Sequence, residues 1–168
     1  KLVSVTDPLS RQFLFSYNTN GQLASVTYPS AVPGSGNNPI ISFGYDSGSR
    51  ITSLTDPRGK AWTFGYHTNG SLLWEKDPLN NQTSYTYTSG YTEITDARNH
   101  TVRHNYSGGK LTSVVDEQTY STSFGYDGNN NKTNVTDQAG KQWNYTYDSR
   151  GNVLTVTDPL NHTTAITY

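Results

Sequence analysis

Aromatic and β-branched residues alternate with small or polar residues in short segments along the whole chain. In one of them, Ile41, Phe43 and Tyr45 are separated by Ser42 and Gly44. Alternation with a period of two indicates a β-strand that presents one apolar face for burial. Each copy of the segment ends in a tyrosine, at Tyr17, Tyr45, Tyr66, Tyr87, Tyr106, Tyr126, Tyr147 and Tyr168. We therefore expect these strands to share one buried stripe of rings, in which Trp62 and Trp143 also lie.

A second segment alternates with the first and ends in an aspartate. The copies end at Asp7, Asp56, Asp77, Asp96, Asp116, Asp137 and Asp158, with Tyr28 in the same place once. Aliphatic residues mostly stand two and five positions earlier, such as Leu54 and Ile51 before Asp56. Offsets of two and five would point to opposite faces of a straight strand. The segment therefore predicts a second strand in which either a β-bulge intervenes or both faces are partly covered.

The residues after each aspartate are typical of a tight turn. Asp56–Gly59 (DPRG) has the residue preferences of a type I turn, and Asn80, Asn99 and Asn161 hold the fourth place in other copies. A positive φ is expected there. The aspartate carboxylate can accept a backbone N–H bond from two residues on. The recurring aspartates are therefore better explained by turn structure than by carboxylate catalysis or calcium binding. A second turn follows each tyrosine, as in Tyr147–Gly151 (YDSRG).

The spacing of the tyrosines sets the length of the repeat. They recur at intervals of 19 to 21 residues, except for 28 between Tyr17 and Tyr45. The excess falls in residues 30–38 (SAVPGSGNN), whose composition marks an inserted loop. Residues 1–168 are therefore predicted to be a single array of about eight two-stranded hairpins. The predicted fold is all-β, a continuous and curved antiparallel sheet.

These residues resemble the YD-repeat (Rhs-repeat) family. The pattern of that family is matched by Tyr45-Asp46 through Asp56–Gly59 to Tyr66, and again by Tyr147–Gly151 through Asp158-Pro159. The family includes Rhs toxins, Tc toxin B and C components, bacterial wall-associated proteins and teneurins. The resemblance implies a sheet that spirals into a hollow shell, which encloses a toxin domain in the toxins and forms an adhesion scaffold in teneurins. The family's C-terminal core has no match here, so no cleavage residues are carried over, and about eight repeats predict an open sheet or a partial turn.

Composition narrows the classes of partner. The 168 residues carry a net charge of −1 and no basic block, which argues against nucleic acid. No apolar run reaches the roughly 20 residues of a membrane helix. The chain has no Met, as expected of a piece of a longer protein, and its lack of Cys excludes a disulfide or thiolate–metal framework. We expect a secreted or cell-surface protein, from a bacterium.

The sequence thus predicts a non-catalytic scaffold segment of a larger YD-repeat protein. No nucleophile elbow or phosphate loop is present, and we expect no enzyme activity, metal or cofactor. The expected partners are the rest of the parent polypeptide, including neighbouring repeats and an enclosed toxin domain. A glycan and a homodimer through edge strands are further expected partners. The alternative function is a carbohydrate-binding or cell-adhesion module.

Trp74 differs from the other residues of its column. Its column is otherwise polar, and the column of its neighbour Glu75 is otherwise aliphatic. A one-residue register shift would turn Trp74 inward and Glu75 outward, and we favour this interpretation. The alternative is an exposed Trp74 on a ligand or partner surface.

Overall fold

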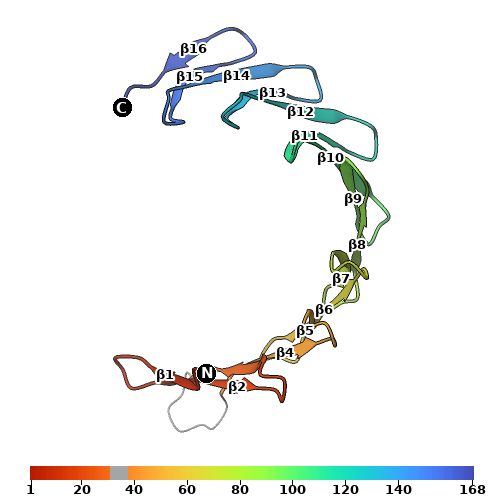
Figure 1. Ribbon diagram of the computed structural model, residues 1–168, viewed down its shortest axis with the longest axis vertical. Coiled ribbons are helices and arrows are strands. Elements are labelled where there is room, and N and C mark those ends of the chain that lie inside the picture. The colour runs from red at the N-terminus through yellow and green to blue at the C-terminus, as the bar shows by residue number, and fades with distance from the viewer. Residues whose placement is uncertain (31–37) are drawn as a thin grey trace. The chain divides into compact units, whose positions relative to one another are not determined.

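The computed structural model describes residues 1–30 and 38–168. In that part of the chain it has sixteen strands and no helix, and the strands are hydrogen-bonded in chain order as an antiparallel sheet (Figure 1). The expected all-β fold of tandem hairpins is therefore confirmed. No helix in the described ranges is long and apolar enough to span a membrane. The loop insertion predicted at residues 30–38 falls mostly outside the described residues.

The strands correspond to the two predicted segments. The strands that lead to a tyrosine are β2 (Gln12–Tyr17), β4 (Ile40–Tyr45), β6 (Ala61–Tyr66), β8 (Gln82–Tyr87), β10 (Thr101–Ser107), β12 (Ser121–Tyr126), β14 (Gln142–Tyr147) and β16 (Thr163–Ala165). The strands that lead to the aspartate position are β1 (Ser4–Thr6), β3 (Leu23–Thr27), β5 (Ile51–Thr55), β7 (Leu72–Lys76), β9 (Tyr91–Thr95), β11 (Lys110–Val115), β13 (Lys132–Thr136) and β15 (Val153–Thr157).

Two compact units divide the chain, Lys1–Ser84 and Tyr85–Tyr168. Within each unit, two kinds of connection alternate between successive strands. We call those that begin at the aspartate position the aspartate turns, at residues 7–11, 56–60, 77–81, 96–100, 116–120, 137–141 and 158–162. Those that follow a tyrosine are the tyrosine turns, at residues 18–22, 46–50, 67–71, 127–131 and 148–152. In a meander of antiparallel strands the two kinds lie at opposite ends of the strands.

A β-bulge accounts for the offsets of two and five. In the hairpin of β4 and β5, Gly44 pairs with Ser53 but Tyr45 pairs with Ile51, so Thr52 has no cross-strand partner. The same register shift occurs just before Tyr17, Tyr66, Tyr106, Tyr126 and Tyr147. Because the extra residue reverses the parity, the two aliphatic positions reach one face of the sheet. The bulge is thus the alternative that the structure supports.

The apolar face is only half-covered, because the sheet is a single layer. No side chain among the described residues is buried. The expected burial of the ring stripe is therefore wrong, and Trp62 and Trp143 are of intermediate exposure. Burial of a sheet face requires a second layer packed roughly 10 Å away, and here each ring is covered only by its neighbours along the sheet.

Candidate functional site

The aspartate turns share one hydrogen-bonded geometry, in which the carboxylate accepts backbone N–H groups of its own turn. Asp56 Oδ1 accepts the backbone N–H groups of Arg58 and Lys60, both at 2.9 Å. The Asp56 N–H donates to the Lys60 carbonyl at 2.8 Å, and Gly59 has a φ of 75°. The same pair of bonds to Oδ1 forms at Asp7, Asp77, Asp96, Asp116, Asp137 and Asp158. As expected, Asn80, Asn99 and Asn161 have a positive φ.

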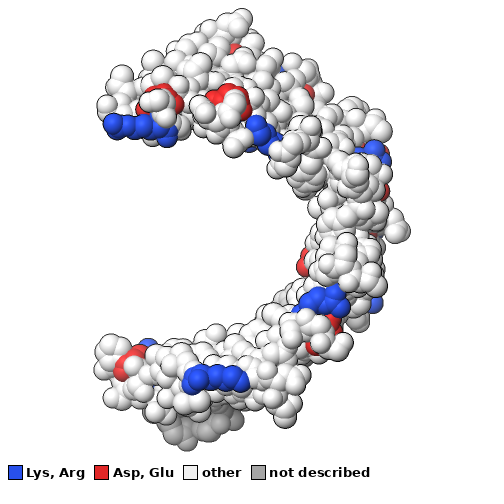
Figure 2. Space-filling model, viewed as in Figure 1, with Lys and Arg blue, Asp and Glu red and all other residues white. Residues whose placement is uncertain are grey.

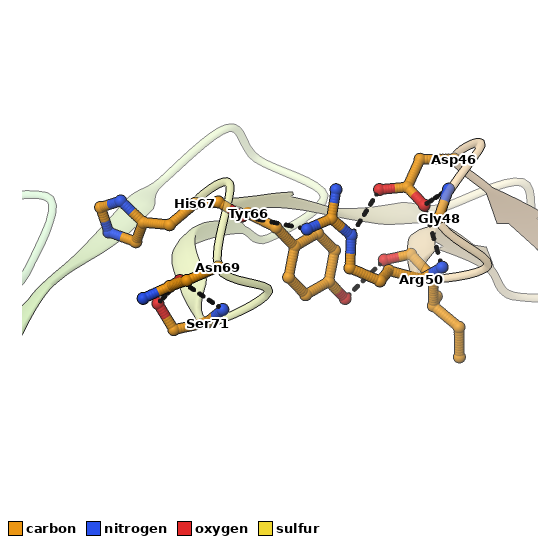
Figure 3. Close-up of polar contacts among 8 residues, drawn as sticks. Asp46, Gly48, Arg50, Tyr66, His67, Asn69 and Ser71 are labelled. Atoms are coloured by element: carbon orange, nitrogen blue, oxygen red, sulfur yellow. Dashed lines mark hydrogen bonds and ion pairs between the residues drawn. The ribbon is translucent and has the colours of Figure 1, made fainter.

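The tyrosine turns have the same geometry, which the sequence analysis did not foresee. Asp46 Oδ1 accepts the N–H groups of Gly48 at 2.8 Å and Arg50 at 3.0 Å (Figure 3). Asp127 and Asp148 bind their own turns in the same way. A signal was present in the sequence, because Gly, Ser or Asn, and once Thr119, stands three residues after the first turn residue in both kinds of turn. Both signature aspartates are therefore turn residues.

Hydrogen bonds to the ionised form lower the pKa of the Asp56, Asp77 and Asp96 carboxyls. For Asp56 and Asp96 the main cause is the backbone N–H of the fifth turn residue, Lys60 and His100 respectively. For Asp77 the main cause is the side-chain amide of Asn81, which donates to Oδ2 at 2.7 Å. A general acid or base near neutral pH needs the opposite shift in a carboxyl pKa. Asp56, Asp77 and Asp96 thus stay ionised near neutral pH and serve as hydrogen-bond acceptors.

The repeat tyrosines fasten the open ends of the hairpins. Tyr66 on β6 donates its hydroxyl hydrogen to the carbonyl oxygen of Ile51 on β5 at 2.7 Å. Equivalent bonds join Tyr17 to Leu2, Tyr45 to Leu23 and Tyr147 to Lys132, at 2.8 to 2.9 Å. Each bond lies at the end of the strand pair that is opposite its connecting turn. The repeat tyrosine is therefore a hydrogen-bonding fastener rather than a buried core residue.

A basic side chain links successive tyrosine turns in the first unit. Arg50 donates from Nε to Asp46 Oδ2 at 2.7 Å and from Nη1 to the His67 carbonyl at 3.0 Å (Figure 3). Its guanidinium lies 4.9 Å from the centre of the Tyr66 ring. In the second unit, Lys110 repeats the arrangement with the Tyr126 ring at 5.6 Å and the Asp127 carbonyl. These links make adjacent hairpins interdependent.

Charged side chains elsewhere are used in local pairs. On the face shown in Figure 2, the charged patches are small and scattered, and most of the surface is uncharged. Arg11 pairs with Asp7, and Arg58 with Asp56, each at 2.7 Å. Among residues 1–30 and 38–168, no group of three or more His, Asp or Glu side chains is arranged to hold a metal ion. The two ion pairs lie within aspartate turns.

Trp74 lies on the polar face of an unshifted strand. Gly65 pairs with Trp74 and Phe64 with Glu75, the register that the other hairpins have at these places. The favoured register shift is therefore wrong. The Trp74 ring lies where a side chain at Gly65 would stand, so the missing side chain makes room for it. The Lys76 ammonium lies 5.2 Å from the ring centre, and Trp74 is of intermediate exposure, like Trp62 and Trp143.

Two grooves lie between successive aspartate turns. The Trp62 groove has a volume of about 410 Å³ and is lined by Arg58, Lys60, Trp62, Asp77, Pro78 and Leu79. The Trp143 groove has a volume of about 450 Å³ and is lined by Asp137, Lys141, Trp143, Asp158, Pro159 and Leu160. Sequence reasoning missed both grooves because each joins residues of two neighbouring hairpins.

Comparison with known proteins identifies the repeat. The profile of the RHS Repeat family matches residues 1–32, 105–137 and 133–163, which together are more than half of the chain. No curated protein matches in a sequence search. Two similar solved structures are the complex TcdB2-TccC3-Cdc42 and the Tc holotoxin pore of Photorhabdus luminescens. The first has a TM-score of 0.70 and 16% identity over 94% of this chain. The second has a TM-score of 0.68 and 16% identity over 92%.

This chain corresponds to only part of those structures. It covers 10% of the matched chain in the first and 9% in the second. At this level of identity the similarity establishes the fold, which is that of a hairpin-repeat sheet. The family profile, the tyrosine fasteners and the aspartate turns agree with one another, and the chain belongs to the RHS repeat family.

Proposed function

We propose that the chain is a non-catalytic structural segment of a larger secreted RHS-repeat protein, and that it forms part of the wall of a shell around a toxin domain. The likeness to Tc toxin complexes supports this proposal, as does the small share of those chains that it covers. Its first partners are the neighbouring repeats of the parent polypeptide. A single-layer sheet leaves one apolar face for contact with an enclosed chain.

The hydrogen bonds of the signature residues carry the scaffold role. The tyrosine hydroxyls and turn carboxylates, which are the groups most suggestive of chemistry, bind the backbone of the repeat itself. The carboxyls of Asp56, Asp77 and Asp96 have lowered pKa values and lie in successive aspartate turns, where each accepts backbone N–H groups of its own turn. Carboxylate catalysis instead uses two groups with different environments.

Protease protection in the parent polypeptide tests the shell. The intact protein is digested with trypsin, and the peptides released over time are identified by mass spectrometry. We expect segments that follow the repeats to resist cleavage, and to lose that resistance when residues 1–168 are deleted. The Tyr66→Phe/Tyr147→Phe variant, which keeps every hairpin, should show an intermediate loss. Equal cleavage of those segments in all three proteins would contradict the shell role.

A carbohydrate-binding or adhesion role is the second candidate, and Trp74 is the observation that favours it. A partly exposed indole on a polar face offers a flat platform on which a sugar ring can stack. The Gln82 amide donates to Ser84 Oγ at 2.8 Å, and Ser84 pairs with Trp74 across the strands. A glycan array with the wild-type chain and Trp74→Ala tests this role. Glycan binding that the substitution abolishes supports the carbohydrate-binding role. If the wild-type chain binds no glycan, only the scaffold role stands.

A further inference from the structure

The Trp62 and Trp143 grooves are two copies of one arrangement. Corresponding residues are 81 positions apart, so a lysine, a tryptophan, an aspartate, a proline and a leucine recur in each groove. Each groove lies within one compact unit. The leucines are among the most exposed apolar residues of the chain, with 76% of Leu79 and 74% of Leu160 accessible. Exposed apolar surface that recurs with the same neighbours indicates a binding surface.

In the first hairpins, an aromatic side chain of the chain itself fills the place that corresponds to the groove. Phe13 takes the place of Trp62 in the ring stripe, and Tyr28 takes the place of Asp77. The ring of Tyr28 packs edge-on against that of Phe13, with 5.6 Å between the ring centres and 75° between the planes. Edge-to-face packing is a preferred geometry for two aromatic side chains. In the first hairpins, the chain itself therefore fills the space beside the Trp62 position with an aromatic ring, that of Tyr28.

The lysine of each groove is a second feature that favours binding of an aromatic ring. Within the described residues, the ammonium groups of Lys60 and Lys141 form no ion pair or hydrogen bond. Elsewhere in the chain basic side chains lie over rings, as Lys132 lies over Phe124 at 4.7 Å and Arg103 over Tyr91 at 4.4 Å. An incoming aromatic ring would provide each free ammonium with the same contact. An aliphatic group would provide none.

The charges of the two grooves argue against an ionic ligand. Arg58 lines the first groove, and its counterpart is Ala139, whereas Asp137 lines only the second. A ligand chosen by its charge would therefore distinguish the two grooves. The features that they share are apolar walls, an indole and one lysine beside one aspartate. A neutral ring fits both.

We propose that the Trp62 and Trp143 grooves are equivalent sites for the aromatic side chains of a polypeptide partner, tyrosine or phenylalanine. The entering ring packs against the indole and the Pro-Leu wall of the next turn, and it meets the lysine ammonium at the rim. The geometry is local to each unit, so the proposal stands whether or not the parent protein forms a shell.

NMR of the indole N–H groups tests the proposal, because the chain has three tryptophans. N-acetyl-tyrosinamide is titrated into ¹⁵N-labelled protein after the three signals are assigned from Trp→Phe variants. We expect saturable shifts of the Trp62 and Trp143 signals and an unmoved Trp74 signal. Leu79→Ser should reduce the shift at Trp62 at least threefold, and Leu160→Ser should do so at Trp143.

Leu9→Ser is the matched control, because Leu9 is 74% exposed in an aspartate turn but lines neither groove. It should leave both shifts unchanged. Dispersed indole signals confirm that each variant is folded. Three results would overturn the proposal: no saturable shift, an equal shift at Trp74, or an equal response to N-acetyl-leucinamide. An equal or larger response to maltose would also overturn it, in favour of a sugar site.

Discussion

Tyr66→Phe removes one hydroxyl and leaves the ring in place beneath the Arg50 guanidinium. The lost bond is the 2.7 Å contact from the Tyr66 hydroxyl to the Ile51 carbonyl. A net hydrogen bond contributes about 0.5–1.5 kcal/mol. This one is solvent-exposed at the ends of β5 and β6, where water can replace the donor, so we expect a loss of about 0.5–1 kcal/mol. In a chain of this length that corresponds to a fall in Tm of roughly 1–4 °C.

Tyr126→Phe is the control for that substitution. Tyr126 holds the same place in its repeat and has the Lys110 ammonium 5.6 Å from its ring, but its hydroxyl forms no hydrogen bond within the described residues. Loss of the Tyr126 hydroxyl should change the free energy of unfolding by less than about 0.3 kcal/mol, as is usual for surface changes. Urea unfolding followed by near-UV circular dichroism measures both. Equal effects of the two substitutions, or a larger effect of Tyr126→Phe, would refute the fastener role.

Other parts of the structure give four further expectations. Asp56→Ala should lower the Tm, because two backbone N–H groups lose their acceptor; Tm unchanged by calorimetry would deny the turn role. At Asp56, Asp77 and Asp96 the folded-state pKa lies below the ordinary value of 3.8, and this stabilises the folded chain. The stabilisation is complete above about pH 5 and is lost as the pH falls through the folded-state pKa values. Urea midpoints should therefore drop only in acid, and a main drop near pH 6 would implicate histidine instead. Gly65→Ala should cost about 1–3 kcal/mol by collision with the Trp74 ring, and it should cost far less in a Trp74→Ala background; additive effects in that double-mutant cycle would exclude the contact. β1 and β16 end the strand order and leave unpaired backbone groups, so sedimentation should detect a dimer at high concentration, and a monomer throughout would count against edge pairing.

The strands and turns were readable from the sequence because their signals are local. Alternation up to Tyr45 marks a strand, and Asp56–Gly59 specifies its turn by residue preference alone. The bulge at Thr52 was left open, since parity shows that something intervenes but not what it is. The likeness of the two kinds of turn was missed, although their spacing is the same.

The side-chain environments were less predictable because they depend on other strands. The position of Trp74 is decided by the missing side chain of Gly65 on the neighbouring strand, which the column of Trp74 does not reveal. Burial of Trp62 was expected because alternation marks an apolar face. Alternation says nothing about whether a second layer covers that face, and none does here among the described residues. The same exposure creates the grooves.

Tyrosine fasteners close individual hairpins, basic side chains such as Arg50 and Lys110 link neighbouring hairpins, and the described residues form no buried core. The heat-capacity change of unfolding tests the absence of a buried core most directly, because exposure of buried apolar surface is its main source. An ordinary globular protein of 168 residues would give about 2.0–2.5 kcal/mol/K. Scanning calorimetry of the monomeric chain should give clearly less, near half that value. A result within the globular range would mean that the rings are buried in solution, and it would contradict the account.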